Sequence, residues 1–524
     1  MNRWIASQGF WFQLRHSFVG GSTGRVVFQL VKMSVRLVVF LFLAAAAAFI
    51  YLQWRTNSEQ FHNLIKREVA ESLAASELDA RGIQRQQGKL VIGRMAAEGG
   101  NGTFFNALEA RNVHMKMGLA DGLFQSWTPQ QVSISRLDLD LRAGAADEAG
   151  ARGIAEVLFP EDGGSNVATI EIWDVTLRWG TAAATRGSIE HSRVNIRRSD
   201  QMLRMTFTGG HFSQNWLRDL EIKNLVVICT PEGFRFERAE FEKDGTKVDM
   251  TDLRLKAGAS PTVDGICRIS GYAIGDVLPE PLPEFIDGSI SGDFKISGSP
   301  NQSEGIAFDG TVALDKNAVI IFRERIPLLQ ALSVVDGMRS YKRLEFRDGS
   351  FQMKTSGSGI WLDHVNVRSG DVFHLTGSLR VRNPTEEELT SVRADSGAGI
   401  LGSTEGGGLI ANPKMAAEFA LVETVANRDG MADQGETLFD RITGRMEFQR
   451  QQRAASRRLE QMLRYEGAFD ISLPADAFER AELLREKYPP DVSTGRVRLK
   501  VPVEGFLYEL TLSQSEELYL QGKR

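Results

Sequence analysis

Two adjacent residues, Asp363 and His364, have side chains of the types that perform general acid–base catalysis. Because neighbouring residues of a strand point to opposite faces, these two side chains cannot act on each other directly. Ser358 offers a hydroxyl nucleophile in the sequence SGSG, but Ser356 occupies the position where a nucleophile elbow requires its first glycine. Neither pattern predicts a hydrolase.

The patterns for cofactors and metals are equally incomplete. Gly397, Gly399 and Gly402 satisfy the G-x-G-x-x-G spacing of dinucleotide-binding proteins, but polar residues and further glycines flank them instead of a strand and a helix. The seven histidines, at positions 16, 62, 114, 191, 211, 364 and 374, show no H-E-x-x-H spacing. The chain also has no pair of cysteines at the spacing of zinc ligands. We therefore expect no catalytic residue, no cofactor, no metal site and no enzymatic activity.

The two cysteines, Cys229 and Cys267, each lie in a strand-like run. One interpretation is a pair of small buried side chains, which is the usual environment of a free cysteine. The other is a single disulfide between neighbouring strands, which an oxidising compartment would permit.

A spacing of apolar residues, apolar-x-apolar-x-x-apolar-x-apolar, recurs seven times. The copies begin at Leu108, Val132, Ile170, Leu220, Phe234, Val248 and Ile360. Steps of two are the period of a strand with one buried face, whereas the central step of three would turn the second pair to the opposite face. A bulge or bend at that step would restore the face and increase the twist. The cadence therefore predicts a mainly β protein with a few helices, built as one elongated, strongly twisted sheet.

Composition supports a β-rich chain and excludes one class of partner. The 62 basic and 67 acidic residues leave a net charge of -5, so the chain lacks the positive surface that nucleic acids require. The 51 glycines lie mostly between short alternating runs, where tight turns are needed.

Residues 37–54 form an uncharged run of 18 residues, near the lower limit for a transmembrane helix. Residues 1–36 contain five basic residues and no acidic one, so the positive-inside bias places the N-terminus in the cytoplasm. The anchoring side chains are Leu37, Val38, Val39, Phe40, Leu41, Phe42, Leu43, Phe49, Ile50, Tyr51, Leu52 and Trp54. A cleaved signal peptide is the alternative, because alanines 44–48 could supply its site, although 36 preceding residues are long for one. Both interpretations place the remaining chain in a bacterial periplasm, and the first makes it a single-pass inner-membrane protein.

The predicted organisation follows from these patterns. The segments are a cytoplasmic 1–36, a transmembrane 37–54, the first part of the periplasmic sheet 55–287, a second part 288–393, a glycine-rich loop 394–413, and a C-terminal region 414–524 with strands and charged helices. Helices are expected at 58–78, between Arg323 and Leu344, at 449–465 and at 475–488. Closing strands are expected at 495–503 and 506–512.

The second part of the sheet carries a family resemblance. Residues 288–382 contain a helix with the sequence Ile-Pro-Leu-Leu between strands. They also contain an Asp-Gly turn between two strands and a closing Leu-Thr-Gly-Ser-Leu. This succession, with the N-terminal anchor and the repeated cadence, resembles the AsmA-like family. The resemblance implies an inner-membrane-anchored envelope protein with a long apolar β-groove, or β-taco, involved in lipid supply to the outer membrane and in envelope integrity. The region after about residue 394 departs from this pattern.

These patterns together predict a protein that binds or conveys phospholipid along the groove, since each buried methylene contributes about 0.8 kcal/mol. The candidate groove side chains are Phe294, Ile296, Val312, Leu314, Val365 and Val367. The alternative is a non-enzymatic scaffold or assembly factor that recruits envelope proteins through its C-terminal helices.

Overall fold

The computed structural model describes most of the chain. The described ranges are 23–56, 58–86, 89–100, 103–116, 131–142, 167–180, 186–199, 202–256, 261–278, 282–299, 305–315, 318–323, 326–357, 359–383, 463–506 and 512–522, with isolated positions between them. The glycine-rich segment 394–413 and nearly all of the predicted helix 449–465 lie outside the described residues, as does the G-x-G-x-x-G motif.

The described strands form one 22-stranded sheet, which confirms the mainly β prediction. Its strands are β1 (Ala75–Gln86), β2 (Lys89–Gly99), β3 (Phe105–Lys116), β4 (Gln131–Leu141), β5 (Thr169–Trp179), β6 (Gly187–Ser199), β7 (Met202–Thr208), β8 (His211–Gln214), β9 (Leu217–Thr230), β10 (Gly233–Lys243), β11 (Thr246–Asp249), β12 (Arg254–Lys256), β13 (Thr262–Ala273), β14 (Ile286–Gly298), β15 (Ile306–Leu314), β16 (Ile320–Arg323), β17 (Arg343–Phe346), β18 (Asp348–Ser356), β19 (Gly359–Ser369), β20 (Phe373–Arg382), β21 (Arg464–Pro474) and β22 (Arg496–Phe506).

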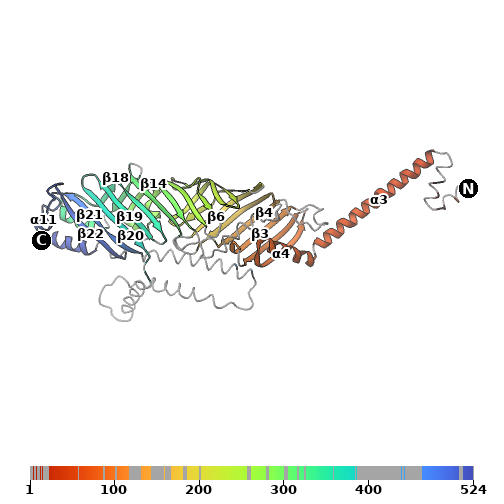
Figure 1. Ribbon diagram of the computed structural model, residues 1–524, viewed down its shortest axis with the longest axis horizontal. Coiled ribbons are helices and arrows are strands. Elements are labelled where there is room, and N and C mark those ends of the chain that lie inside the picture. Colours follow the sequence, from red (N-terminus) through yellow and green to blue (C-terminus); the bar gives the residue numbers. More distant parts are fainter. Residues whose placement is uncertain are drawn as a thin grey trace, which may run out of the picture.

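The helices are α3 (Thr23–Thr56), α4 (Glu59–Leu73), α7 (Pro327–Asp336), α11 (Glu482–Lys487) and α12 (Leu512–Gly522), with short 3-10 helices η1 (Ile274–Asp276) and η2 (Leu282–Glu284). Figure 1 shows the strands stacked along an elongated body, with α3 projecting from one end and α11 at the other.

Strand order in the sheet mostly follows chain order. Several positions hold two short strands in line: β7 and β8 both pair with β6 and β9, and β11 and β12 both pair with β10 and β13. The pairs β15/β16 and β17/β18 continue each other in the same way beyond β14. Among the described pairings, only β4–β5 is parallel.

The predicted irregularities occur at the steps of three. Register shifts fall at the step in β5, in β9 and β10, and in β19. The copy that begins at Val248 is divided between β11 and β12, with Asp252 at φ 67° in the gap. In β9 the residues on both sides of the step, Leu220, Ile222, Leu225 and Val227, enter the same core cluster. The irregularity therefore restores the buried face, as the cadence predicts.

Strands β3 and β4 meet the constraint differently. Their register with each other is the same on both sides of the step, because both strands carry the irregularity at the same level. Asn112 takes φ 50° there, a left-handed conformation that asparagine tolerates better than most residues. Val113 and Leu108 still share one core cluster.

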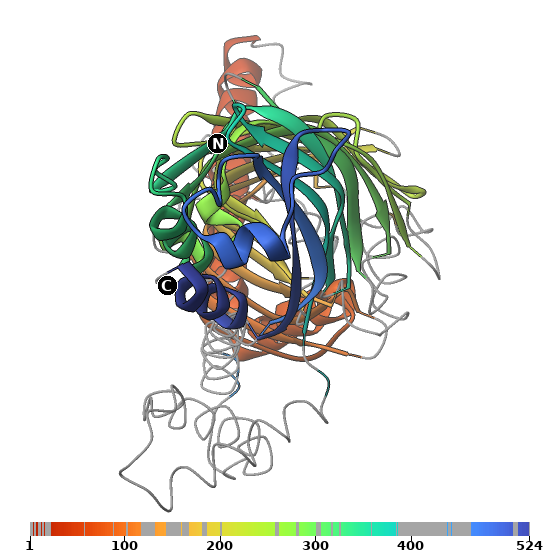
Figure 2. The ribbon, with the colours of Figure 1, turned by 90° about the vertical axis from the view of Figure 1, so that its left-hand side faces the viewer.

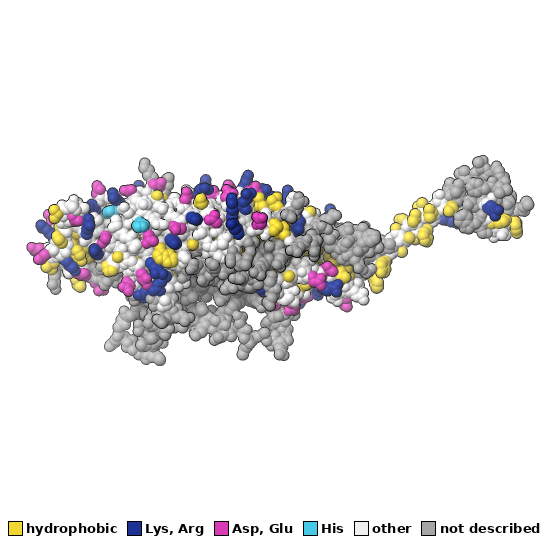
Figure 3. Space-filling view, viewed as in Figure 1, with side chains coloured by type: hydrophobic (Ala, Val, Ile, Leu, Met, Phe, Trp, Pro, Cys, Tyr) yellow, Lys and Arg dark blue, Asp and Glu magenta, His cyan; other side chains and the backbone are white. Residues whose placement is uncertain are grey.

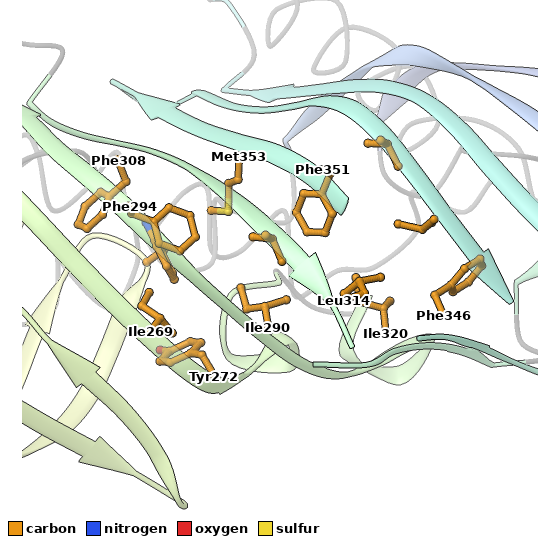
Figure 4. Packing of buried hydrophobic residues seen from close by; sticks show 14 of the residues in the cluster. Ile269, Tyr272, Ile290, Phe294, Phe308, Leu314, Ile320, Phe346, Phe351 and Met353 are labelled. Carbon is orange, nitrogen blue, oxygen red and sulfur yellow. The ribbon is translucent and has the colours of Figure 1, made fainter. Parts of the chain in front are cut away.

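Most of the apolar core lies on one face of this sheet. The main core cluster extends from β5 to β22 and includes residues of α7 and α12. Figure 4 shows its labelled side chains, from Ile269 on β13 to Met353 on β18, gathered on the same side of the strands. Figure 2, which faces the C-terminal end, shows the strands curving around the interior and the blue helices lying at that end.

The first part of the sheet has its own cluster, which α4 covers. Phe61 and Ile65 of α4 are buried against residues of β1–β4. Ser58 caps this helix, and Lys66 donates to Asp79 of β1 at 3.1 Å. The predicted juxtamembrane helix is therefore present, but it ends at Leu73, where Ala74 turns into the left-handed conformation and β1 begins.

The predicted C-terminal elements need correction. The helix expected over 475–488 is reduced to α11, because turns occupy residues 475–480. The strand over 495–503 is confirmed as β22, which continues to Phe506. Instead of a strand that ends at Leu512, helix α12 begins there, and Leu518 packs into the main core cluster.

A contact from the C-terminal region reaches the first part of the sheet. Leu438 and Ile442, four residues apart, are buried against Ala96 of β2 and Ala107 of β3. Neither alanine belongs to the cluster that α4 covers. The region after residue 394 therefore contacts β2 and β3 directly.

The predicted membrane-spanning run lies within α3. Its described large apolar side chains are exposed, including Phe42 at 73%, and Figure 3 shows apolar side chains along the projecting helix. Phe49 and Leu52 are in α3, but their side chains lie outside the described set. Within the part of the chain that the structure describes, no helix combines the length and apolarity required to cross a membrane.

The bulge in β19 leads to a testable prediction about His364. This exposed residue has φ 52°, a conformation that costs a β-branched residue about 1–2 kcal/mol. We expect His364→Val to lower the free energy of unfolding by about that amount, and His364→Gly to leave it unchanged or raise it slightly. Urea unfolding measures both. Arg368→Val, at an exposed position of β19 with ordinary φ, is the control, and an equal loss there would contradict the bulge.

Candidate functional site

The structure contains an apolar cavity of about 460 Å³, partly open to solvent, which is lined by elements far apart in the sheet. Residues from β6 and β9 line it together with residues from β14, β16–β22 and α7. A flat sheet could not bring β6 and β22 to one cavity, because many strands separate them. The sheet is therefore curled so that its apolar face surrounds this space.

Aliphatic and aromatic side chains form most of the wall. The apolar lining includes Ile290 of β14, Phe351 and Met353 of β18, Leu375, Leu379 and Val381 of β20, Ile471 of β21 and Val501 of β22. Leu328 and Leu329 of α7 close one side. Pro327 at the first turn starts this helix, and its apolar face turns toward the sheet as the sequence predicts.

The predicted groove residues all belong to the main core cluster, but only some of them line the cavity. Val365 and Val367 line it, whereas Phe294, Ile296, Val312 and Leu314 are buried without lining it. The reason is aromatic packing. Trp216, a cavity-lining residue, packs edge-on against Phe294 at 5.8 Å and against Phe308 at 5.5 Å between ring centroids. These rings fill the space beside Phe294 of β14 and Phe308 of β15, whereas Ile290 of β14 still lines the cavity.

The lining also includes polar residues of β6, β8 and β9 and of the segments that flank these strands, which we call the polar group. It comprises Arg186, Ser188, Glu190, Ser213, Asn215 and Arg218. Ser188 and Ser213 are paired positions of β6 and β8, and the Asn215 N–H donates to the Arg186 carbonyl at 3.1 Å. No sequence pattern predicts this group, because its members lie on separate strands and form no local motif.

A polar cluster holds α7 in place beside the cavity. The Tyr341 hydroxyl donates to the buried Asp336 carboxylate at 2.5 Å. Arg339 contacts Asp336 at 3.3 Å and donates to Asp476, after β21, at 2.7 and 2.8 Å. Burial and the neighbouring Asp336 carboxylate raise the pKa of Tyr341, so its hydroxyl remains a donor at neutral pH. These bonds tie the end of α7 to the segment between β21 and α11.

The residues with catalytic side chains do not converge on the cavity. Asp363 and His364 lie on β19 but are absent from the lining, and Ser358 lies outside the described residues. His191 and His211 contact different carboxylates, Asp174 at 3.2 Å and Asp219 at 3.0 Å. Among the described residues, no group of three or more His, Cys, Asp or Glu side chains is arranged to hold a metal ion.

Both cysteines are buried free thiols. Cys229 lies on β9 and Cys267 on β13, and β10 with the β11/β12 position separates these strands. The disulfide alternative requires neighbouring strands and is not realised. Burial raises the pKa of each thiol well above its usual value, so both remain protonated.

Comparisons with known proteins do not assign the chain to a family. Neither protein-family models nor curated proteins nor solved structures gave a match. The resemblance to AsmA-like proteins therefore stays a prediction from the sequence.

The distinction between residues that line the cavity and buried residues that do not can be tested by replacing one valine of each kind with phenylalanine. Val367→Phe places extra volume in the cavity and should change the free energy of unfolding by less than about 1 kcal/mol. Val312→Phe overpacks a fully buried position and should lower it by about 1–3 kcal/mol. Denaturant unfolding compares the two variants. Equal losses at both positions would mean that no space is available beside Val367.

Proposed function

We propose that this protein is a membrane-anchored, non-enzymatic lipid-binding protein of the AsmA-like type, which holds phospholipid acyl chains in the apolar cavity. The observation that carries the proposal is the cavity itself, with apolar walls from β14, β16–β22 and α7. The acyl chains of a phospholipid match such walls, because they are apolar along their whole length.

The energetics favour a ligand with a hydrocarbon chain. The cavity volume lies within the range of about 300–1,000 Å³ that is usual for small-molecule sites. Each methylene moved from water into such a space contributes about 0.8 kcal/mol, so a chain of ten carbons gains several kcal/mol without any directed polar contact. Tail recognition would therefore be broad.

The curled sheet is the feature that suits lipid conveyance. In this proposal the concave apolar face acts as the β-groove of the family resemblance, and the cavity is its open part. Val365 and Val367 serve as contact residues, whereas Phe294, Ile296, Val312 and Leu314 pack in the same core cluster without lining the cavity. Such a groove would carry phospholipid toward the outer membrane in outer-envelope biogenesis.

The anchoring part of the proposal rests on α3. Its described large apolar side chains between Leu37 and Trp54 are exposed, and a helix that is apolar on all sides is stable only in an apolar environment. We propose that residues 37–54 lie in the bacterial inner membrane, with the N-terminus in the cytoplasm and the sheet in the periplasm. The charge bias before residue 37 supports this orientation.

One observation favours the alternative function, an envelope scaffold. Several apolar side chains of the C-terminal helices are exposed, including Leu483 of α11 and Leu520 of α12. Exposed apolar side chains of this kind are compatible with a protein partner. In this alternative, the closed packing around Phe294 extends to the whole core and no lipid enters.

Lipid binding is tested on the full-length protein purified from bacterial membranes. Mass spectrometry should detect bound phospholipid in the parent protein. The variant Val365→Phe/Val367→Phe fills the cavity and should retain at most about one tenth of that lipid. Ile266→Phe, at an exposed aliphatic position of β13 outside the lining, is the matched control and should retain all of it. A parent protein without lipid, or a filled variant with the full amount, would contradict the proposal.

The anchor is tested by charge. Each arginine placed at the centre of a membrane-spanning helix costs about 2.5–3.5 kcal/mol, so Leu41→Arg/Phe42→Arg should shift the protein from the membrane to the soluble fraction. Sedimentation of membranes after alkaline extraction measures the distribution. Ser34→Arg, near the proposed cytoplasmic end of the segment, is the control and should stay membrane-bound. Retention of the double variant would argue against insertion of 37–54.

A further inference from the structure

The outer face of β2–β5, opposite to the core that α4 covers, carries buried residues that we call the outer patch. The strand register places them in two adjoining rows: Ala96, Glu109, Asp138 and Thr176 in one, and Ala107, Asp140 and Arg178 in the other. Residues that alternate with these, including Leu108 and Leu139, belong to the cluster beneath α4. Every member of the outer patch is at most 6% exposed. Because charged side chains on the outside of a sheet are normally solvated, their burial means that another part of the chain covers them.

Leu438 and Ile442 cover the apolar part of this patch. Both positions are helical and four residues apart, so the two side chains share one face of a helix. They are 5% and 1% exposed and form a separate cluster with Ala96 of β2 and Ala107 of β3. The small alanine side chains allow the larger aliphatic groups to approach the sheet closely. These two residues therefore dock at the apolar part of the outer patch.

The docked residues belong to the connection between β20 and β21. These strands are paired as far as Arg382 and Arg464, so the chain leaves the sheet and re-enters it at the same place. Asn383 and Leu463, at the two ends of the connection, line the cavity. The contact therefore joins the cavity region to the part of the sheet from which α3 projects (Figure 1).

Ion pairs within the sheet hold the charged part of the outer patch. Glu109 accepts from Arg94 of β2 at 3.0 Å and from Arg111 of β3 at 2.9 Å. Asp138 accepts from Arg136 at 2.9 Å and lies 3.8 Å from Arg178 of β5. All these partners belong to β2–β5, so the pairs remain when the docked segment leaves. Exposing the patch would then hydrate paired charges instead of stranding unpaired ones, unlike the exposure of an apolar core.

We propose that the outer patch is a docking surface for the connection between β20 and β21, and that this docking is reversible. The segment with Leu438 and Ile442 then acts as a releasable strap on the first part of the sheet. Interfaces within a chain that combine a small apolar contact with charged surroundings resemble transient protein–protein interfaces. Their local opening requires less free energy than unfolding of the whole sheet. This inference gives the region after residue 394 a partner on its own chain, and it does not depend on lipid binding.

The experiment measures how fast an added thiol reacts with a maleimide in the folded, full-length protein. Ala107→Cys places the thiol in the outer patch, and Lys116→Cys places one at an exposed position of the same strand. Cys229 and Cys267 are buried free thiols and report global unfolding. The thiol of Ala107→Cys should react at least about tenfold more slowly than that of Lys116→Cys, while both natural thiols stay unreacted.

Release of the strap is tested by charge. Carboxylates cannot stay in the apolar contact, so adding Leu438→Asp/Ile442→Asp should bring the rate for Ala107→Cys close to that for Lys116→Cys. Leu483→Asp/Leu520→Asp, at exposed positions of α11 and α12, is the matched control and should leave the rate unchanged. Leu438→Ala/Ile442→Ala removes most of the contact without adding charge. It should raise the rate at least about threefold, which keeps the test decisive if the charged variant fails to fold.

Three results would overturn the proposal. Rapid reaction of Ala107→Cys without further substitutions would mean that the patch is uncovered in solution. A slow rate that neither the aspartate nor the alanine pair changes would mean that other residues cover it. Reaction of Ala107→Cys only together with Cys229 and Cys267 would mean that the contact opens only on global unfolding, as a permanent core does.

Discussion

The structure depends on one constraint, the need to keep a single apolar face buried along strands whose apolar positions are separated by two, three and two residues. An unbroken strand cannot satisfy this spacing, because the step of three turns the later residues to solvent. The chain responds with bulges in β5, β9, β10 and β19, and with an interrupted strand at β11/β12. Bulges increase local twist, and their recurrence in successive strands accompanies the curling of the sheet.

The curl explains why a cavity exists where it does. Side chains on the concave face of a curled sheet converge, and whether they meet depends on their size. Around Trp216, Phe294 and Phe308 the aromatic rings fill the interior. Along β19–β22 the lining is mainly aliphatic, and α7 stands against it, held by Arg339 and Asp476. The space left between them is the feature on which the lipid-binding proposal rests.

Much of this arrangement could be predicted from local sequence. The mainly β class, the bulges, the helix that begins at Pro327 and the helix before β1 all follow from spacing and from turn-forming residues. The C-terminal elements were predicted less well. The short helix α11 and the helix α12 at the end of the chain take their form from packing, as Leu518 in the main core cluster illustrates. The step of three also left one point open, since β3 and β4 absorb it together without a change of register.

By itself, the sequence determined which residues share a buried face, because side-chain direction along a strand follows from spacing alone. It also determined the position of the apolar run in α3 and the near balance of acidic and basic residues. The tertiary structure decided which buried residues face open space: Val365 and Val367 line the cavity while Val312 does not. It also decided that Arg186, Asn215 and Arg218 line the same cavity as β19–β22, which are far from them in the sequence. Both outcomes depend on the curvature of the sheet and on ring packing between distant strands, which no local pattern encodes.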